Sequence, residues 1–278
     1  MRSGIETKGP KQLEPYTLVI FDFSGTLSLG AVDFGKPDRL QQHLEKSGLA
    51  AIGIDTADRY WRGVVNPTWA KASRSATGFK TIAADYIRSQ GLSKASRKSI
   101  TAALSRFVDA YLHCSHIDPK WQPLLAEIQQ APDAFGLVAT DHYAEATIAI
   151  REHLAAVGIT ATAASGLKGP QKQTPFIVAN SADIGCPKAE GRFWQTLQAT
   201  CLPMPLKKVI LVDDFGLSEQ AADGYAQPDR ITERIAATQM ALGEVLQVVP
   251  RIIQFRIEGE PADAIAATVQ SVRKALQA

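Results

Sequence analysis

The stretch LVIFDFSGTL, residues 18–27, places one acid, Asp22, directly after four apolar residues. Gly25 and Thr26 follow almost at once. A short apolar run that is bounded by turn-forming residues is typical of a strand buried on both faces of a parallel sheet. Open α/β sheets bind their ligands at the carboxyl ends of such strands. The stretch therefore predicts a fold and the first residue of a functional site.

Further apolar runs of the same kind predict the rest of the sheet. Three of them span residues 135–139, 176–179 and 209–212, and residues 252–256 are a candidate fifth strand. Apolar residues recur at helical spacing between and after these runs, at residues 145–157, 192–201, 218–225, where Ser218 is the expected N-cap, and 261–276. Alternating strands and helices predict an α/β fold with a parallel sheet.

One long segment between the first two strands breaks this alternation. Residues 33–118 contain no clear strand pattern, and residues 38–49, 78–92 and 95–114 have the apolar spacing of amphipathic helices. We therefore predict a three-layer, Rossmann-like parallel sheet core, residues 1–32 and 119–278, with an inserted α-helical cap, residues 33–118. The insert leaves the sheet at the carboxyl end of a strand, so it could cover a site there. A further helical piece is expected at residues 226–250.

Composition and charge exclude several classes of function. The 278 residues carry a formal net charge of +2 with no basic run, which argues against a nucleic-acid partner. No apolar stretch is long enough for a membrane span, and the polar lead-in at residues 1–15 lacks the apolar segment of a signal peptide. The three cysteines are far apart and form neither a disulfide framework nor a zinc pattern. These features predict a protein of the reducing cytoplasm.

Chemically active side chains follow each of the four main predicted strands. Asp22 follows the first, Thr140 the second, Lys188 lies in the loop after the third, and Asp213 and Asp214 follow the fourth. In a parallel sheet these strand ends share one edge, so the groups can converge. Three crowded carboxylates repel one another unless a cation is present, and Mg²⁺ suits a site of few carboxylates plus a phosphate. The lysine and the threonine hydroxyl would bind anionic oxygens, so the set predicts a phosphoryl-transfer site.

Segments that carry these residues resemble motifs of the haloacid dehalogenase (HAD) superfamily, whose members are mostly Mg²⁺-dependent phosphatases. The resemblance lies in VIFDFSGTL (19–27), the hydroxyl of Thr140, NSADIGCPKAEGRFW (180–194) and VILVDDFGLSEQAA (209–222), in this order. The helical insert is similar to the cap of one subfamily. The resemblance implies that Asp22 is a nucleophile that forms an aspartyl-phosphate.

The same resemblance implies roles for the other site residues. Ser24, Thr140 and Lys188 would act with Asp22 in catalysis. Mg²⁺ would be held by Asp22, the backbone carbonyl of Ser24, Asp213 and Asp214. The predicted substrate-binding residues are Gly25, Thr26, Asp141 and His142.

Ser24 departs from the pattern of the family's phosphatases, which have a second aspartate at this place. That aspartate protonates the leaving oxygen and then activates water, and such help contributes on the order of 10²–10⁴ in rate. A serine hydroxyl has too high a pKa to do the same. The protein could act slowly, or on good leaving groups such as acyl phosphates. It could use a substitute acid, for which Asp141 and His142 are the nearest candidates. It could also have become a binding or regulatory protein without turnover.

Two other branches of the family fit less well. Its dehalogenases need no metal and have fewer acids than Asp213 and Asp214 provide. Its phosphonate-cleaving enzymes need a cap lysine, and neither Lys71 nor Lys80 lies in a matching stretch. We therefore predict an Mg²⁺-dependent hydrolase of a small phosphorylated metabolite, in which Arg62, Lys71 and Arg74 are candidate anion contacts of the cap.

Overall fold

A computed structural model describes residues 15–169 and 175–278 of the chain, so the predicted N-terminal lead-in lies almost wholly outside the described residues. Within them, a six-stranded sheet has the order β3-β4-β2-β1-β5-β6, and every neighbouring pair is parallel. The strands are β1 (Tyr16–Phe21), β2 (Ala134–Thr140), β3 (Ala161–Ala163), β4 (Phe176–Asn180), β5 (Leu206–Asp213) and β6 (Arg251–Gln254).

The five predicted strands are all present in this sheet. The fifth is shifted toward the N-terminus and ends at Gln254 instead of residue 256. The edge strand β3 was missed because it is three residues long and its side chains are only half-buried, which leaves no apolar run to recognise.

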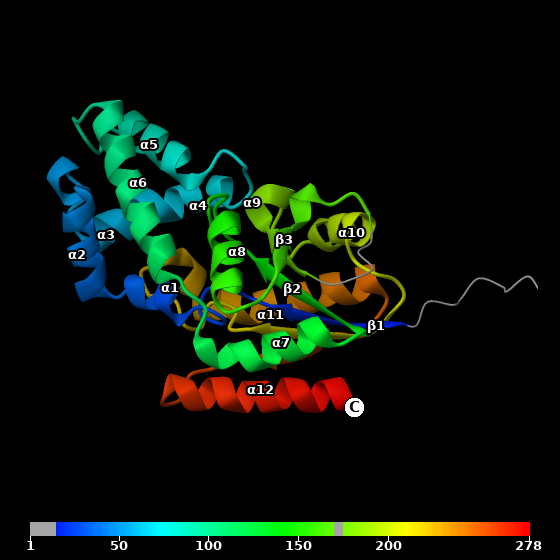
Figure 1. Cartoon of the computed structure of the whole chain (residues 1–278). Helices are drawn as coiled ribbons and strands as arrows, with labels where there is room; N and C mark the ends of the chain where they lie inside the picture. The colour runs from blue at the N-terminus through cyan, green and yellow to red at the C-terminus, as the bar shows by residue number, and fades with distance from the viewer. Residues whose placement is uncertain (1–14, 170–174) are drawn as a thin grey trace, which may run out of the picture.

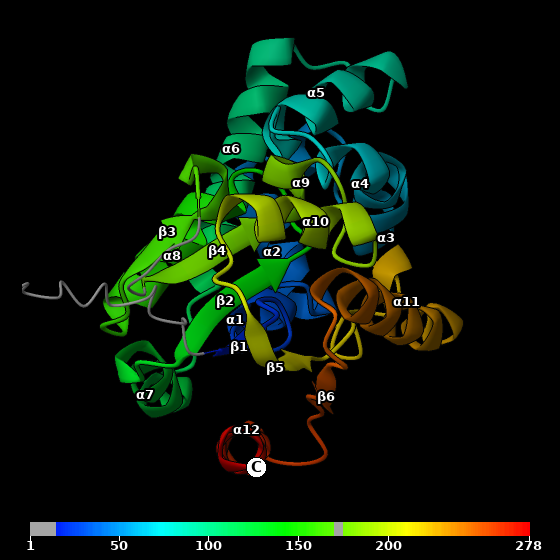
Figure 2. The ribbon, with the colours of Figure 1, turned by 90° about the vertical axis from the view of Figure 1, so that its right-hand side faces the viewer.

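Helices cover both faces of the sheet, as the prediction of three layers requires. On one face lie α7 (Gln122–Gln130), α8 (Ala146–Ala156) and α12 (Pro261–Gln277), and on the other lie α10 (Gly191–Thr200) and α11 (Pro228–Leu246) (Figures 1 and 2). Successive residues of β1 alternate between these faces, because side chains alternate along a strand: Val19 packs toward the first set, and Leu18 and Ile20 toward the second.

Between β1 and α7 the chain forms helices joined by turns and loops. The insert contains α1 (Leu29–Phe34), α2 (Pro37–Ser47), α3 (Ala57–Tyr60), α4 (Asn66–Ala72), α5 (Phe79–Ser89) and α6 (Arg97–Cys114), with a 3-10 turn at Ala50–Ile52 and a π-helical turn at Trp61–Val65. These helices form their own lobe beside the sheet and enclose their own apolar core, to which Leu44, Ile82 and Leu104 belong (Figure 1). The fold class predicted from the sequence, an α/β core with an inserted helical cap, is therefore confirmed.

Polar contacts hold this lobe against the carboxyl edge of the sheet. Glu145, just before α8, accepts hydrogen bonds from the backbone N–H groups of Phe79 at 2.9 Å and Lys80 at 3.0 Å, and so caps α5. Asn66 bonds the loop after β5 through the Ala222 carbonyl (3.1 Å) and the Gly224 N–H (3.0 Å). A third contact is the ion pair between Arg74 and Glu190, at 2.8 Å.

The prediction of a helix at residues 218–225 is wrong. Residues 214–223 form turns, a 3-10 turn follows at Gly224–Ala226, and the next α-helix begins only at Pro228. The physical reason is that Asp214 accepts hydrogen bonds from the N–H groups of Gly216 (3.0 Å) and Ser218 (2.9 Å), which turns the chain back on itself. The helical piece expected at residues 226–250 is present as α11.

Other described features concern short turns, thiols and helix length. Short helical turns lie at Pro119–Trp121, Ala164–Gly166 and Ser181–Ile184, the last labelled α9. The three cysteines are free. Of the helices in the described residues, none is both long and apolar enough to cross a membrane.

Close packing between β2 and β4 depends on a glycine. A Cβ built on Gly136 would lie 2.4 Å from the Phe176 ring, inside van der Waals contact. We expect Gly136→Ala to lower the free energy of unfolding by about 1–3 kcal/mol, because a buried ring must move. Urea unfolding followed by circular dichroism measures this. Gly259→Ala is the matched control, since no atom lies within 4 Å of its added Cβ. Equal stabilities of the two variants would contradict the packing argument.

Candidate active site

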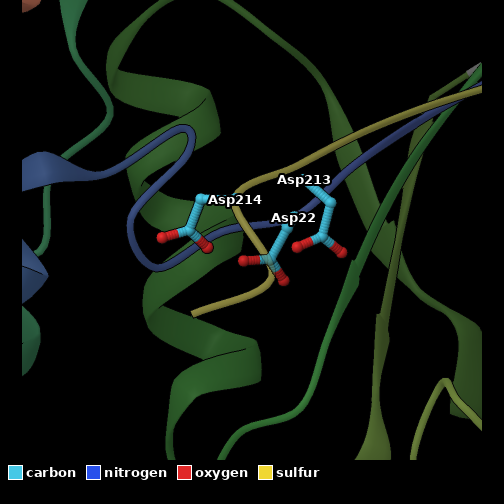
Figure 3. Close-up of side chains that lie close together, drawn as sticks. All are labelled: Asp22, Asp213 and Asp214. Carbon is cyan, nitrogen blue, oxygen red and sulfur yellow. The ribbon is translucent and has the colours of Figure 1, made fainter. Parts of the chain in front are cut away.

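Three carboxylates meet at the carboxyl edge of the sheet. Asp22 follows β1, and Asp213 and Asp214 lie at and after the end of β5, the neighbouring strand. The Asp22 N–H donates to the Val212 carbonyl at 2.9 Å, which holds the two strand ends together. One oxygen from each carboxylate lies within 4.8 Å of the others, and all three residues are buried. In Figure 3 the Asp22 carboxylate lies between those of Asp213 and Asp214.

The Lys188 ammonium is the fourth charged group of this cluster. Its Nζ lies 2.5 Å from Oδ1 of Asp22 and 2.7 Å from Oδ2 of Asp213. Its backbone is also fixed, because its N–H donates to Asp141 at 2.9 Å and its carbonyl accepts from the Trp194 indole at 2.7 Å. The lysine predicted from the sequence is therefore directed at the predicted nucleophile.

Burial and charge act in opposite directions on these groups. Burial lowers the pKa of Lys188, but the charges of Asp213 and Asp22 raise it by more. The pKa of Lys188 therefore lies above its usual value, and the amine stays charged. Burial raises the pKa of Asp22; Lys188 offsets part of this shift, and Asp213 and Asp214 add to it. Burial and Asp213 likewise raise the pKa of Asp214. A second cation would relieve this repulsion.

The donor set fits a hard divalent cation. Its members are carboxylate oxygens, which Mg²⁺ prefers, and they are close enough to share one ion. Three ionised carboxylates also carry more negative charge than the one ammonium of Lys188 can neutralise. Asp22, Asp213 and Asp214 are thus the residues that could hold Mg²⁺.

Gly25 and Thr26 position Asp214 and do not line the cavity described below. Gly25 has φ +74°, and a Cβ there would lie 2.3 Å from Oδ2 of Asp214, so only glycine fits. The Thr26 hydroxyl accepts the Asp214 N–H at 3.0 Å. Both residues were predicted to bind substrate. The structure places them outside the cavity lining and against Asp214, a predicted metal ligand.

A cavity opens in front of the carboxylates, between the sheet edge and the helical insert. Its empty volume, including the part open to solvent, is about 860 Å³. Of the residues predicted from the sequence, those that line it are Asp22, Ser24, Thr140, Asp141, His142 and Asp214. Lys188 and Asp213 are not among the lining residues; Lys188 contacts Asp22, and Asp213 contacts Lys188.

Asp141 and His142, the two candidates for a substitute acid, are both engaged elsewhere. Asp141 accepts the Lys188 N–H, and burial raises its pKa. Nδ1 of His142 accepts the Tyr143 N–H at 2.8 Å, which assigns the ring proton to Nε2, 3.0 Å from the Tyr111 hydroxyl. Burial lowers the pKa of His142 to about 4, so its ring is neutral near pH 7.

Glu219 is the site residue that sequence reasoning missed. The Ser24 hydroxyl donates a hydrogen bond to its Oε1 at 2.9 Å, and both residues line the cavity. Burial, assisted by Asp223 and Asp214, raises the pKa of Glu219 to about 8. The wrongly predicted helix concealed this contact, and the only signal in the sequence was the density of acids in residues 213–223.

The basic residues proposed as anion contacts do not reach the cavity. Arg62 pairs with Asp58 at 3.1 Å, Arg74 pairs with Glu190, and Lys71 is exposed. Lys80, the other candidate cap lysine, pairs with an exposed aspartate on α6 at 2.6 Å. None of these four residues lines the cavity.

Comparisons with known proteins give distant structural likenesses. No family model matches the sequence, and a search of curated proteins gave no match. The chain is similar to a HAD-like family hydrolase from Porphyromonas gingivalis, with 15% identity and a TM-score of 0.48 over 93% of this chain and 98% of that one. It is also similar to a 2-haloacid dehalogenase from Pseudomonas syringae pv. Tomato DC3000, with 14% identity and a TM-score of 0.41 over 92% and 99%. Both likenesses are too distant to carry an argument about the function of this chain.

The neutral state of His142 makes stability depend on pH. Its pKa is about 4 when folded and 6.5 when unfolded, so the unfolded chain binds the extra proton between these values. Its contribution is complete above pH 6.5 and is lost as the pH falls toward 4. We expect a loss of about 2 kcal/mol of unfolding free energy by pH 5.

The measurement is urea unfolding at pH 7 and pH 5. His142→Asn should lose less stability than the wild type over this interval, because it lacks the titrating ring. His113→Asn, at an exposed histidine, should behave like the wild type. Identical pH dependence of all three proteins would show that His142 is not held neutral.

Proposed function

We propose that the protein is a cytoplasmic, Mg²⁺-dependent hydrolase of small phosphate monoesters, with Asp22 as the nucleophile. The observation that carries the proposal is the placement of Asp22. Its carboxylate lines the cavity, touches the Lys188 ammonium and lies beside Asp213 and Asp214. Phosphoryl transfer requires this combination of an oxygen nucleophile and charge-neutralising groups.

The metal would be held by Asp22, Asp213, Asp214 and the backbone carbonyl of Ser24. When bound, Mg²⁺ would neutralise negative charge on the phosphoryl oxygens. Among the residues that the structure describes, Lys188 is the one basic side chain within ion-pair distance of these carboxylates.

The reaction proceeds in two displacements at phosphorus. A carboxylate oxygen of Asp22 attacks, the bond to the ester oxygen breaks, and that oxygen leaves with its electron pair and takes up a proton. Water then attacks the aspartyl-phosphate, which releases phosphate and restores the Asp22 carboxylate. Lys188 binds Oδ1 of Asp22 and so orients the carboxylate, and the Thr140 hydroxyl donates to a phosphoryl oxygen.

Glu219 is our candidate for the proton donor to the leaving oxygen. Its hydrogen bond to Ser24 keeps it beside the position where the family's phosphatases have their acid. With a pKa of about 8 it is protonated near pH 7 and can donate. Neither Asp141 nor His142 is as well suited. Asp141 accepts the Lys188 N–H and the Tyr225 hydroxyl, and His142 bonds the Tyr143 N–H and the Tyr111 hydroxyl.

Two alternatives from other classes remain distinct from this proposal. Dehalogenation needs no metal, whereas the cluster of Asp22, Asp213 and Asp214 has an excess of negative charge that favours one. A binding protein without turnover is favoured by Ser24, since its side chain is not an acid. Metal-dependent ligand binding without phosphate release would identify the binding protein.

The first test uses 4-nitrophenyl phosphate and acetyl phosphate, with and without Mg²⁺. We expect phosphate release only with Mg²⁺, and a fall to the background rate in Asp22→Asn, because the amide cannot attack phosphorus. Asp38→Asn, in an exposed turn of α2, is the matched control and should keep the activity. Hydrolysis that survives Asp22→Asn would disprove the nucleophile.

The second test separates Glu219 from the nucleophile by leaving group. Glu219→Gln should slow hydrolysis of an alkyl phosphate by on the order of 10²–10⁴, because an alkoxide needs a proton to leave. It should slow 4-nitrophenyl phosphate much less, since nitrophenolate leaves unprotonated. Glu233→Gln, at an exposed glutamate of α11, is the control. Equal effects on both substrates would argue against an acid role for Glu219.

A further inference from the structure

Aromatic rings form much of the wall of the cavity above the carboxylates. Trp69 stands edge-on to Tyr143, with ring centroids 5.3 Å apart, and to Tyr225, at 5.9 Å. Tyr60 stands edge-on to Trp61 at 5.1 Å. All five rings line the same cavity. This part of the site therefore offers ring faces and edges to the body of a substrate.

A carboxylate lies among these rings. Asp223 lines the cavity and accepts the Tyr225 N–H at 2.9 Å. Burial is the main cause of the raised pKa values of Tyr60 and Tyr143, and the charge of Asp223 adds to both shifts. Glu219, nearer to Ser24, is a second acid of the same wall.

No lysine or arginine of the described residues lines the cavity. Among all residues that the structure describes, no basic side chain lies within ion-pair distance of Asp223. Arg234 does not line the cavity. Its guanidinium lies 3.5 Å from the Tyr225 ring centroid and donates a hydrogen bond to the Tyr225 carbonyl. Burial raises the pKa of Asp223, and Arg234 offsets only part of this shift.

These features select among possible substrate bodies. An anionic body would meet the like charge of Asp223 and no basic residue of the cavity lining. An uncharged body would cover the half-buried carboxylate of Asp223 without giving it a charged partner, which is unfavourable. A cationic body would face both the carboxylate and the electron-rich ring faces, which attract cations such as alkylammonium groups.

We propose that the substrate is a phosphate monoester of an amino alcohol, whose quaternary or alkylammonium group lies between the aromatic rings and Asp223. The placement of the phosphate at Asp22 rests on the proposed function. The placement of the ammonium group rests only on the cavity wall, so the two assignments can fail separately.

The test compares two substrates of the same shape. Choline phosphate carries a trimethylammonium group, and 3,3-dimethylbutyl phosphate replaces the nitrogen with carbon. We expect kcat/KM for choline phosphate to exceed that of the neutral isostere by about tenfold or more, because cation–π and ion-pair contacts act only on the charged body. Both substrates are alkyl phosphates, but the ammonium group also makes choline the more acidic alcohol, so the change of the ratio in cavity-wall variants decides whether binding causes the preference.

Variants assign the preference to the cavity wall. Asp223→Asn keeps an oxygen that can accept the Tyr225 N–H and should reduce the ratio between the two substrates to about threefold or less. Trp69→Leu should also reduce it, since leucine fills space without a ring face. Asp229→Asn, an exposed aspartate of α11, should keep the wild-type ratio.

Binding of free choline provides a readout that does not depend on turnover. Trp61 and Trp69 lie in the cavity, so choline should change the tryptophan fluorescence, and 3,3-dimethylbutanol should do so only at about tenfold higher concentration. Choline binding in a protein that hydrolyses no phosphate ester would support the ammonium site and overturn the proposed function.

Other results would overturn the ammonium site and leave the hydrolase intact. One is hydrolysis of the neutral isostere as fast as choline phosphate, or faster. Another is hydrolysis of 4-nitrophenyl phosphate without any response to choline or choline phosphate. A preference for choline phosphate that Asp223→Asn and Trp69→Leu leave unchanged would also contradict the assignment.

Discussion

The site depends on the ion pairs that the buried ammonium of Lys188 makes with Asp22 and Asp213. They join three segments that are far apart in sequence and lie at the ends of β1, β5 and the loop after β4. Like charges at neighbouring strand ends would otherwise repel across a buried edge. Removing one partner of such a buried ion pair costs about 3–5 kcal/mol, because the remaining charge is left without compensation. The placement of both carboxylates is thus tied to one side chain.

The turns after β5 extend this arrangement toward the helical insert. Asp214 bends the chain by accepting two backbone N–H groups, and the bend carries Glu219 to Ser24 and Asp223 to the aromatic wall. Asn66 of the insert bonds the same segment near Gly224. One irregular loop therefore connects the carboxylate cluster, the cavity wall and the lobe above them. A substitution in it would affect reaction, binding and docking together.

The sequence predicted what depends on local pattern. Apolar runs in the sequence predict buried strands, and the groups that follow parallel strands lie at one edge of the sheet. For this reason the sequence placed Asp22, Lys188, Asp213 and Asp214 in one site. Glu219 could not be found this way, since its place is decided by the long-range contacts of an irregular loop. The supporting roles of Gly25 and Thr26 were equally hidden, because they depend on where Asp214 comes to lie.

The way the helical insert is fastened has a consequence for how the protein works over time. Glu145 at α5, Asn66 at the loop and the Arg74–Glu190 pair are polar contacts that water can replace. The rings of Phe79 and Trp69 also pack on Tyr143, which follows β2. Apart from Tyr143, the apolar core of the insert consists of its own residues. Release of product past this lobe would require these polar and ring contacts to separate, and such an opening can be the slowest step of a catalytic cycle.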